Sequence, residues 1–261
     1  MALDHAGIVR AADLLYAARS GGKGLDTLPE ELRPQGLAEA EAIRDALFAR
    51  LGGTVTGWKI GFAAPSSPGR PGYVDWMTGP MIAERLYAAP ARLKRPNIRS
   101  LFIEAEFGFR MTRGLPLRGT PYSEDEIAGA AEAICGLELA GTVWNDPMHT
   151  DQKLQIADMG VAWGYIPGPP IPGWRERDMR KIGVEVVYDG KVVSTAFEGD
   201  AQTDAFATLV GMVARLARRG EWLRAGWYVT TGAAAMPKLL GDAREVVVRW
   251  DGIGEVRATF E

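Results

Sequence analysis

Residues 101–111 read LFIEAEFGFRM, a mostly apolar run that contains two glutamates. Its length and composition predict a buried strand. Side chains on a strand alternate between the two faces of a sheet, so Glu104 and Glu106 point to the same side. The other side carries Ile103, Ala105 and Phe107 and belongs in the core. The stretch therefore predicts a core strand that presents two carboxylates on one face.

Two ionised carboxylates side by side on an apolar strand repel each other, raise each other's pKa and resist burial. A bound cation removes these costs. A third acid, Glu138, lies in another short apolar segment, residues 134–143. Three carboxylates suit a hard ion such as magnesium or manganese rather than zinc. The alternative interpretation is an amphipathic strand whose glutamates lie on its solvated side.

Lys59 is the second candidate for chemistry, because it interrupts the apolar strand predicted over residues 55–62. One interpretation is a cation that binds a substrate carboxylate or enolate. The other is a strand-edge lysine in contact with solvent. The only histidines are His5 and His149, which argues against a Ser-His-Asp or Cys-His nucleophilic apparatus. Cys135 is interpreted as a small core residue.

The order of elements predicts the fold class. Helical patterns occupy residues 4–19 and 37–51, and further helices are predicted over 123–133 and 203–218. Asp189-Gly190 and Asp251-Gly252 predict β-hairpins, and the proline-rich residues 168–173 predict irregular backbone. We therefore predict an α+β fold with a mixed, mainly antiparallel sheet. Residues 1–54 would form a helical N-terminal part and residues 55–261 a β-rich catalytic domain.

Composition excludes several classes of function. Apolar residues make up 47% of the 261 residues and charged residues 24%, and the formal net charge is -3. These values are ordinary for a globular protein and give no basic footprint for nucleic acid. A single cysteine excludes an internal disulfide. The N-terminal segment does not read as a signal peptide, and no apolar run approaches the roughly 20 residues of a membrane span. We expect a soluble, cytoplasmic protein with no membrane partner.

Taken together, several segments resemble the 2-keto-4-pentenoate hydratase and 2-oxo-3-hexenedioate decarboxylase family of the fumarylacetoacetate hydrolase superfamily. The resemblance runs almost from end to end. It is carried by AADLL at 11–15, LPEELRP at 28–34, GWKIG at 57–61, IEAE at 103–106, LEL at 137–139, IAD at 156–158, LRAG at 223–226 and TTG at 230–232.

The resemblance implies a β-roll with a small helical N-terminal part, assembled as a homo-oligomer. It also implies roles for individual side chains. A magnesium or manganese ion would be held by Glu104, Glu106 and Glu138. Lys59 would be catalytic, and Asp75 would move protons. Thr231 and Asp158 would bind a small 2-oxo or 2-hydroxydienoic acid.

The activity expected on this basis is the metal-dependent addition of water to a 2-hydroxy-2,4-dienoate. The alternative is decarboxylation of a dicarboxylic substrate of the 2-oxo-3-hexenedioate type, for which Arg70 would bind the second carboxylate. An acylpyruvate carbon–carbon hydrolase is a further alternative, against which the absence of histidine from residues 59–80 argues. The last alternative is a non-catalytic homologue.

The sequence also departs from the family pattern, at Met159, Glu198 and Trp227. These departures bear on the substrate more than on the metal site. Trp58, Trp76 and Trp163 lie near the motifs. From them we expect a bulky, aromatic pocket, which favours a substrate with an apolar distal end.

Overall fold

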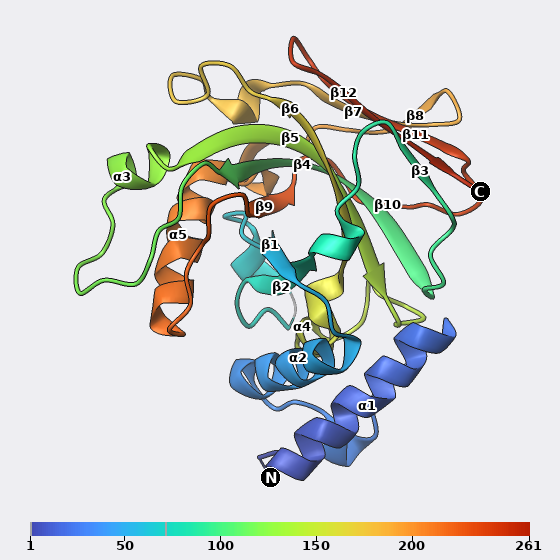
Figure 1. The fold of residues 1–261 in the computed structure, drawn as a ribbon. Helices are drawn as coiled ribbons and strands as arrows, with labels where there is room; N and C mark the ends of the chain where they lie inside the picture. The colour runs from blue at the N-terminus through green and yellow to red at the C-terminus, as the bar shows by residue number, and fades with distance from the viewer. Residues whose placement is uncertain (1, 71) are drawn as a thin grey trace.

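The computed structural model describes residues 2–70 and 72–261. The chain begins with two helices, α1 (His5–Gly21) and α2 (Leu37–Leu51), which lie side by side below the sheets in Figure 1. Asp4 caps α1, because its carboxylate accepts a hydrogen bond from the backbone N–H of Gly7. Gly22 ends the helix in the left-handed conformation.

The strands form two sheets. The first has the order β2-β1-β9-β4-β5-β6, with β10 beside β4. Its members are β1 (Val55–Gly61), β2 (Met77–Ile82), β4 (Ser100–Met111), β5 (Ala131–Thr142), β6 (Ala162–Pro170), β9 (Tyr228–Ala233) and β10 (Lys238–Leu239). The second has the order β3-β12-β11-β7-β8. It contains β3 (Ala91–Leu93), β7 (Val184–Tyr188), β8 (Lys191–Thr195), β11 (Glu245–Trp250) and β12 (Gly254–Phe260).

Three further helices connect the strands. They are α3 (Glu124–Ala128), α4 (Gln152–Ala157) and α5 (Ala205–Arg218). Most strand pairs are antiparallel, and β1–β9 and β3–β12 are parallel. The long strands β4 and β5 curl across the molecule (Figure 1). The result is a mixed α/β fold with a curled, mainly antiparallel sheet, so the prediction of a mixed sheet is confirmed.

The hydrophobic core follows from strand alternation. On β4, Ile103, Ala105 and Phe109 are fully buried on the face away from the glutamates. They belong to one apolar cluster that continues into Val246 and Val248 of the second sheet. Burial of each large apolar side chain stabilises the fold by about 1.5–3 kcal/mol. The core thus holds β4 with its glutamates facing the opposite side.

The N-terminal helices share a second apolar cluster with residues 143–159. Leu15 of α1 and Leu47 of α2 pack there with Trp144 and Met159. The helices are therefore joined to the sheet by buried contacts.

Two local predictions were wrong in extent. The capping box of Ser123 and Glu126 is present, but α3 ends at Ala128 and β5 begins at Ala131. Residues 131–142 are almost entirely buried because β5 lies between β4 and β6, and strand pairing there replaces the helix predicted to residue 133. Residues 168–170, predicted to be irregular, end strand β6. This strand lies at the sheet edge, where proline costs no ladder bond.

Both hairpin predictions are confirmed. Asp189-Gly190 joins β7 to β8, and residues 251–253 join β11 to β12. The predicted helix over 203–218 is present as α5, with Asp204 as its cap.

Candidate active site

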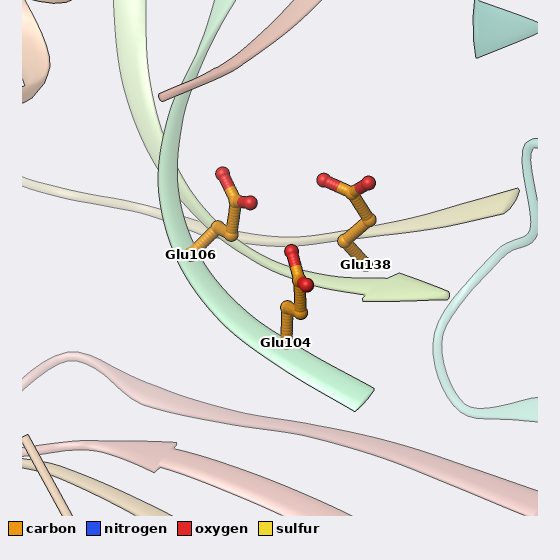
Figure 2. A group of neighbouring side chains, drawn as sticks. All are labelled: Glu104, Glu106 and Glu138. Atoms are coloured by element: carbon orange, nitrogen blue, oxygen red, sulfur yellow. The ribbon is translucent and has the colours of Figure 1, made fainter. Parts of the chain in front are cut away.

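Three carboxylates lie together on one face of the first sheet. Glu104 on β4 and Glu138 on β5 are direct cross-strand neighbours, and Glu106 follows on the same face of β4. One oxygen from each group lies within 4.8 Å of the others. Figure 2 shows the three side chains converging from the two strands. Glu106 is 0% exposed and Glu138 2%.

The two buried carboxylates have one satisfied oxygen each. The backbone N–H groups of Thr231 and Gly232 donate to Oε2 of Glu106, at 2.8 and 2.9 Å. The hydroxyl of Thr230 donates to Oε2 of Glu138 at 3.0 Å. The Oε1 atoms of both groups have no hydrogen-bond donor among the described residues. Such buried acceptors are costly unless a ligand satisfies them.

The pKa shifts of the buried glutamates also indicate that the site requires a ligand. Burial, followed by repulsion from Glu138 and Glu104, raises the pKa of Glu106 well above its usual value. Burial also raises the pKa of Glu138, although the charge of Lys59 opposes this shift. The metal-free site thus disfavours the ionised form of both acids.

Lys59 of β1 is the cation in this environment. It is 1% exposed, and its Nζ atom lies 3.8 Å from Oε1 of Glu138. Burial alone would lower the pKa of Lys59, but the charges of Glu104, Glu138 and Glu106 outweigh burial and the net shift is upward. Lys59 is therefore an ammonium ion, and it offsets only one of three negative charges.

The donor set fits a hard divalent cation. All three groups offer carboxylate oxygens, and two buried oxygens lack donors among the described residues. Oxygen-only sets of this kind suit magnesium, manganese or calcium. After Lys59 is counted, two negative charges remain when all three acids are ionised, and a divalent ion would balance them.

A left-handed turn positions Lys59. Met159, Gly160 and Val161 have φ values of 61°, 56° and 55°, and a β-branched residue rarely adopts this conformation. The turn presents the carbonyl oxygen of Gly160 to Nζ of Lys59 at 3.2 Å. A Cβ at Gly160 would lie 2.5 Å from the carbonyl oxygen of Thr78. Strained backbone of this kind costs on the order of 1–3 kcal/mol per residue and is frequent at functional sites.

A cavity of 380 Å³ opens beside Lys59 and Glu104. Aromatic and sulfur-containing side chains dominate its walls, and serines, Thr142, Gln155, Thr203 and Arg70 supply polar groups. The apolar lining includes Phe62, Met77, Phe102, Met148, Val161, Phe197 and Met236. The cavity has the size of a small-molecule site.

The structure brings some predicted residues to this cavity. Arg70 lines it, and its guanidinium lies 4.6 Å from the centre of the Phe62 ring. Thr231 lies beside the site, where its N–H holds Glu106 and its hydroxyl donates to the carbonyl of Phe107 at 2.7 Å. The Thr231 hydroxyl is therefore already engaged in the fold.

Two other predicted residues are not brought to the cavity. Both oxygens of Asp75 accept hydrogen bonds from Arg215, and Asp75 is absent from the described cavity lining. Burial raises the pKa of Asp75. Its hydrogen bonds to Arg215 and to the backbone of Trp76 lower this pKa by a larger amount, so the net shift is downward. An ionised carboxylate paired with arginine is a poor proton donor.

Asp158 is a buried structural acid. Its Oδ1 pairs with Arg19 of α1, and its Oδ2 accepts from the hydroxyl of Thr142 at 2.6 Å and from the N–H of Val143 at 2.9 Å. Both oxygens are occupied, so Asp158 ties α1 to the end of β5. Asp158 is absent from the described cavity lining.

The tryptophan expectation was wrong for Trp58 and Trp76, which are absent from the described cavity lining and pack under Arg44 and Arg215. Trp163 is also absent from this lining, but it lines a separate, small cavity beside Lys59 and Glu138. Trp58 precedes Lys59 on a strand, so it faces the opposite side. The aromatic wall is instead formed by Phe62, Phe102 and Phe197.

Sequence reasoning missed Thr230 and Tyr165. Thr230 supports Glu138, and the fully buried hydroxyl of Tyr165 has no partner among the described residues. Tyr165 lies directly opposite Glu138 on β6, and a Cβ at Gly136 would lie 1.9 Å from its hydroxyl oxygen. The TTG motif contained a signal for Thr230. Tyr165 was visible only once the β5–β6 register was known.

Relatives of known activity match nearly the whole chain. The 2-keto-4-pentenoate hydratase of Paraburkholderia xenovorans is 26% identical over 96% of this chain and 94% of its own length. The 4-oxalocrotonate decarboxylase of Pseudomonas sp. strain CF600 is 34% identical over 60% of this chain and 59% of its own. The chain is a homologue of these hydratases and decarboxylases. It is therefore an enzyme, and the predicted resemblance is confirmed. No family model matches the chain.

Solved structures of these enzymes share the fold. The 4-oxalocrotonate decarboxylase of Pseudomonas putida G7, complexed with magnesium and adipate, superposes with a TM-score of 0.84 at 19% identity, over 99% of both chains. A fumarylacetoacetate hydrolase from Exiguobacterium antarcticum gives a TM-score of 0.54 at 14% identity, over 80% of this chain and 76% of that one. Among the described residues of the present chain, no helix is long and apolar enough to cross a bilayer.

Proposed function

We propose that this enzyme adds water to a 2-hydroxy-2,4-dienoate with the help of a divalent cation, magnesium or manganese. The observation that supports this most strongly is the cluster of three glutamates, of which the two buried ones each have an oxygen without a donor among the described residues, while Glu104 lines a mostly apolar cavity. Its homology to 2-keto-4-pentenoate hydratases agrees with this activity.

Glu104, Glu106 and Glu138 would hold the cation. When bound, the cation would supply Lewis-acid stabilisation for negative charge that develops at the 2-oxygen of the substrate. The N–H groups of Thr231 and Gly232 and the hydroxyl of Thr230 fix the two buried carboxylates. They leave the Oε1 atom of each free for the ion.

Lys59 would provide a second positive charge. In the metal-free site the charges of the three glutamates raise the pKa of Lys59, so its side chain is a cation there. The carbonyl of Gly160 and the carboxylate of Glu138 orient the ammonium group. A remaining N–H can then contact the carboxylate or the enolate oxygen of the substrate.

The apolar walls would hold the conjugated chain of the substrate. Phe62, Phe102 and Val161 would line its path and keep bulk water away from it.

Thr231 holds Glu106 through its backbone N–H, and the carboxylate of Asp158 holds Thr142 at the cavity wall. Asp75 is absent from the described cavity lining. A homo-oligomeric assembly remains a prediction.

Decarboxylation of a dicarboxylic substrate is the second candidate. Arg70 favours it, because this arginine lines the cavity with its guanidinium over the Phe62 ring. The fold match to a decarboxylase complexed with adipate is compatible with it. Arg70 is solvent-exposed, which weakens its attraction for a second carboxylate.

The test is to follow dienoate absorbance with purified protein, with magnesium and with a chelator. We expect magnesium-dependent loss of a monocarboxylic 2-hydroxydienoate, with no release of carbon dioxide. Chelator-insensitive turnover would contradict the proposal. Magnesium-dependent release of carbon dioxide from a dicarboxylate, lost in Arg70→Ala, would establish the second candidate instead.

A further inference from the structure

The cavity is larger than an unsubstituted pentadienoate requires. Such an acid has eight non-hydrogen atoms. Even if each atom took the roughly 30 Å³ of a liquid water molecule, the acid would fill about 240 Å³. The cavity measures 380 Å³, so about 140 Å³ would remain. The cavity therefore has room for a substrate that carries an additional group.

The strand register shows where this group would lie. Phe102 precedes Glu104 by two residues on β4, so its ring is on the carboxylate face at a spacing of about 7 Å. Its cross-strand neighbour on β5 is Ala140, a small residue. A substrate whose carbon chain extends from the glutamates toward the start of β4 would therefore meet the ring of Phe102 beside the small side chain of Ala140.

The walls around this position are apolar. Met77, Ala140 and Val161 form a buried cluster, against which Phe62 and Phe102 pack. Four of these five side chains also line the cavity, with Ala140 behind them. Toward the mouth lie Met148 and Met236, which are 59% and 47% exposed. Methionine side chains are flexible and polarizable, and they adapt to aromatic or aliphatic groups of different shapes.

Polar groups for a distal carboxylate are scarce. Thr142 donates its hydroxyl to Asp158, and Gln155 donates its amide to the carbonyl of Pro147. Among the described lining residues, Lys59 and Arg70 are the cations, and Lys59 is held at the glutamates. Arg70 is exposed and stacked on Phe62. A second carboxylate would find one solvated guanidinium, the hydroxyls of Ser66, Ser67 and Thr203, and walls that are otherwise mostly apolar.

We infer that the substrate is a 2-hydroxydienoate with a bulky apolar group, an aryl ring or a long alkyl chain, on its distal carbon. This inference rests on the proposed function and adds the chemical class of the distal substituent. Phe102 and Met236 are the residues that determine this specificity, one at the inner end of the cavity and one at its mouth.

Binding of unreactive 2-oxo acids tests the cavity without turnover. Calorimetry with magnesium would compare 2-oxopentanoate, 2-oxo-6-phenylhexanoate and 2-oxohexanedioate. We expect the phenyl acid to bind at least about tenfold more tightly than 2-oxopentanoate. We also expect the dicarboxylate to bind no more tightly than 2-oxopentanoate. Equal affinities for the first two acids, or tightest binding of the dicarboxylate, would overturn the inference.

Two variants test which residues cause the preference for the phenyl acid. Met236→Lys places a charge at the mouth, and Phe102→Ala removes the inner ring. Both should reduce the preference for the phenyl acid several-fold. Because Met236 is half-exposed, Met236→Lys tests the inference even if Phe102→Ala does not fold. Val192→Ala is the matched control, since Val192 is 52% exposed on β8 and outside the cavity lining. It should keep the full preference, and an equal reduction in the control would contradict the assignment.

Turnover separates this inference from the proposed function. Metal-dependent hydration of the unsubstituted dienoate, with no gain in kcat/KM from a distal phenyl group, would overturn the inference alone. Absence of metal-dependent turnover for every dienoate would overturn the proposed function as well. A higher kcat/KM for the phenyl-substituted dienoate would support both.

Discussion

Charged side chains face one another across strands in both sheets, but they are arranged in opposite ways. On the second sheet, Arg249 of β11 lies opposite Glu185 and Glu255, at 3.6 and 3.4 Å, and all three are exposed. On the first sheet, Glu104 lies opposite Glu138, a residue of the same charge that is buried.

The difference separates charges that suit a solvated surface from charges that require a ligand. Exposed pairs of opposite sign are nearly neutral for stability, each contributing about 0–1 kcal/mol. Directly opposed like charges destabilise a sheet, and burial increases the cost. The acidic cluster therefore lowers the stability of the metal-free protein, and folding alone does not account for it. A bound cation does.

The largest effect is expected from Glu106→Gln, which keeps the shape of the side chain and removes its charge. Loss of a ligand should abolish the magnesium-induced rise in melting temperature and lower kcat/KM by roughly 10³-fold, since metal assistance contributes several kcal/mol. The metal-free variant should melt at a higher temperature than the metal-free wild type, because one buried charge is gone. An unchanged magnesium shift in this variant would show that the site is misassigned.

Lys59→Met should have the next largest effect. The substitution keeps an unbranched side chain of similar length and removes the ammonium group beside the glutamates. We expect kcat/KM to fall by about 10²-fold or more, as for loss of one preorganised electrostatic partner. The thermal transition should remain cooperative. Full activity in a folded Lys59→Met enzyme would remove Lys59 from the mechanism.

The stability of the metal-free protein should depend on pH, and bound magnesium should remove that dependence. Glu106 and Glu138 have folded-state pKa values above the usual 4.5, so the folded protein binds more protons than the unfolded chain above that pH. The unfolding free energy of the metal-free protein should therefore fall as the pH rises through the raised pKa values, by on the order of 1–3 kcal/mol. The raised pKa of Lys59 adds no slope between pH 6 and 8, because Lys59 is protonated in both states there.

Magnesium competes with protons for the same oxygens, so its stabilising effect should be larger at pH 8 than at pH 6. Thermal melts with chelator and with magnesium at both values measure this difference. An equal magnesium shift at pH 6 and pH 8 would be inconsistent with binding by these carboxylates.

The smallest effect is expected on the second sheet. Glu255→Gln breaks the exposed contact with Arg249 and should change the unfolding free energy by no more than about 1 kcal/mol. It should leave the magnesium shift and the activity unchanged. Chemical denaturation at low and high salt measures the change. A loss as large as that of a core substitution would show that the two sheets do not differ as described.

The sequence was most informative where a local rule coincides with the fold. Strand alternation placed Glu104 and Glu106 on one face, and the two Asp-Gly turns predicted their hairpins. Glu138 was identified from its apolar surroundings. Its position opposite Glu104 depends on strand register, which local patterns do not specify.

The failures came from contacts between segments distant in the chain. Asp75 and Asp158 are paired with Arg215 and Arg19, which lie 140 and 139 residues away. Nothing local to either acid signals such a partner. The proline-rich residues 168–170 could be a strand only because β6 proved to be an edge, which is a property of the whole sheet.

A crystal of the protein soaked with manganese tests the central claim most directly. Anomalous scattering locates the ion independently of any activity. We predict one strong anomalous peak coordinated by oxygens of Glu104, Glu106 and Glu138, with the Oε1 atoms of the two buried acids among its ligands. Absence of a peak at these residues, at saturating manganese and pH 8, would contradict the assignment of this cluster as a metal site.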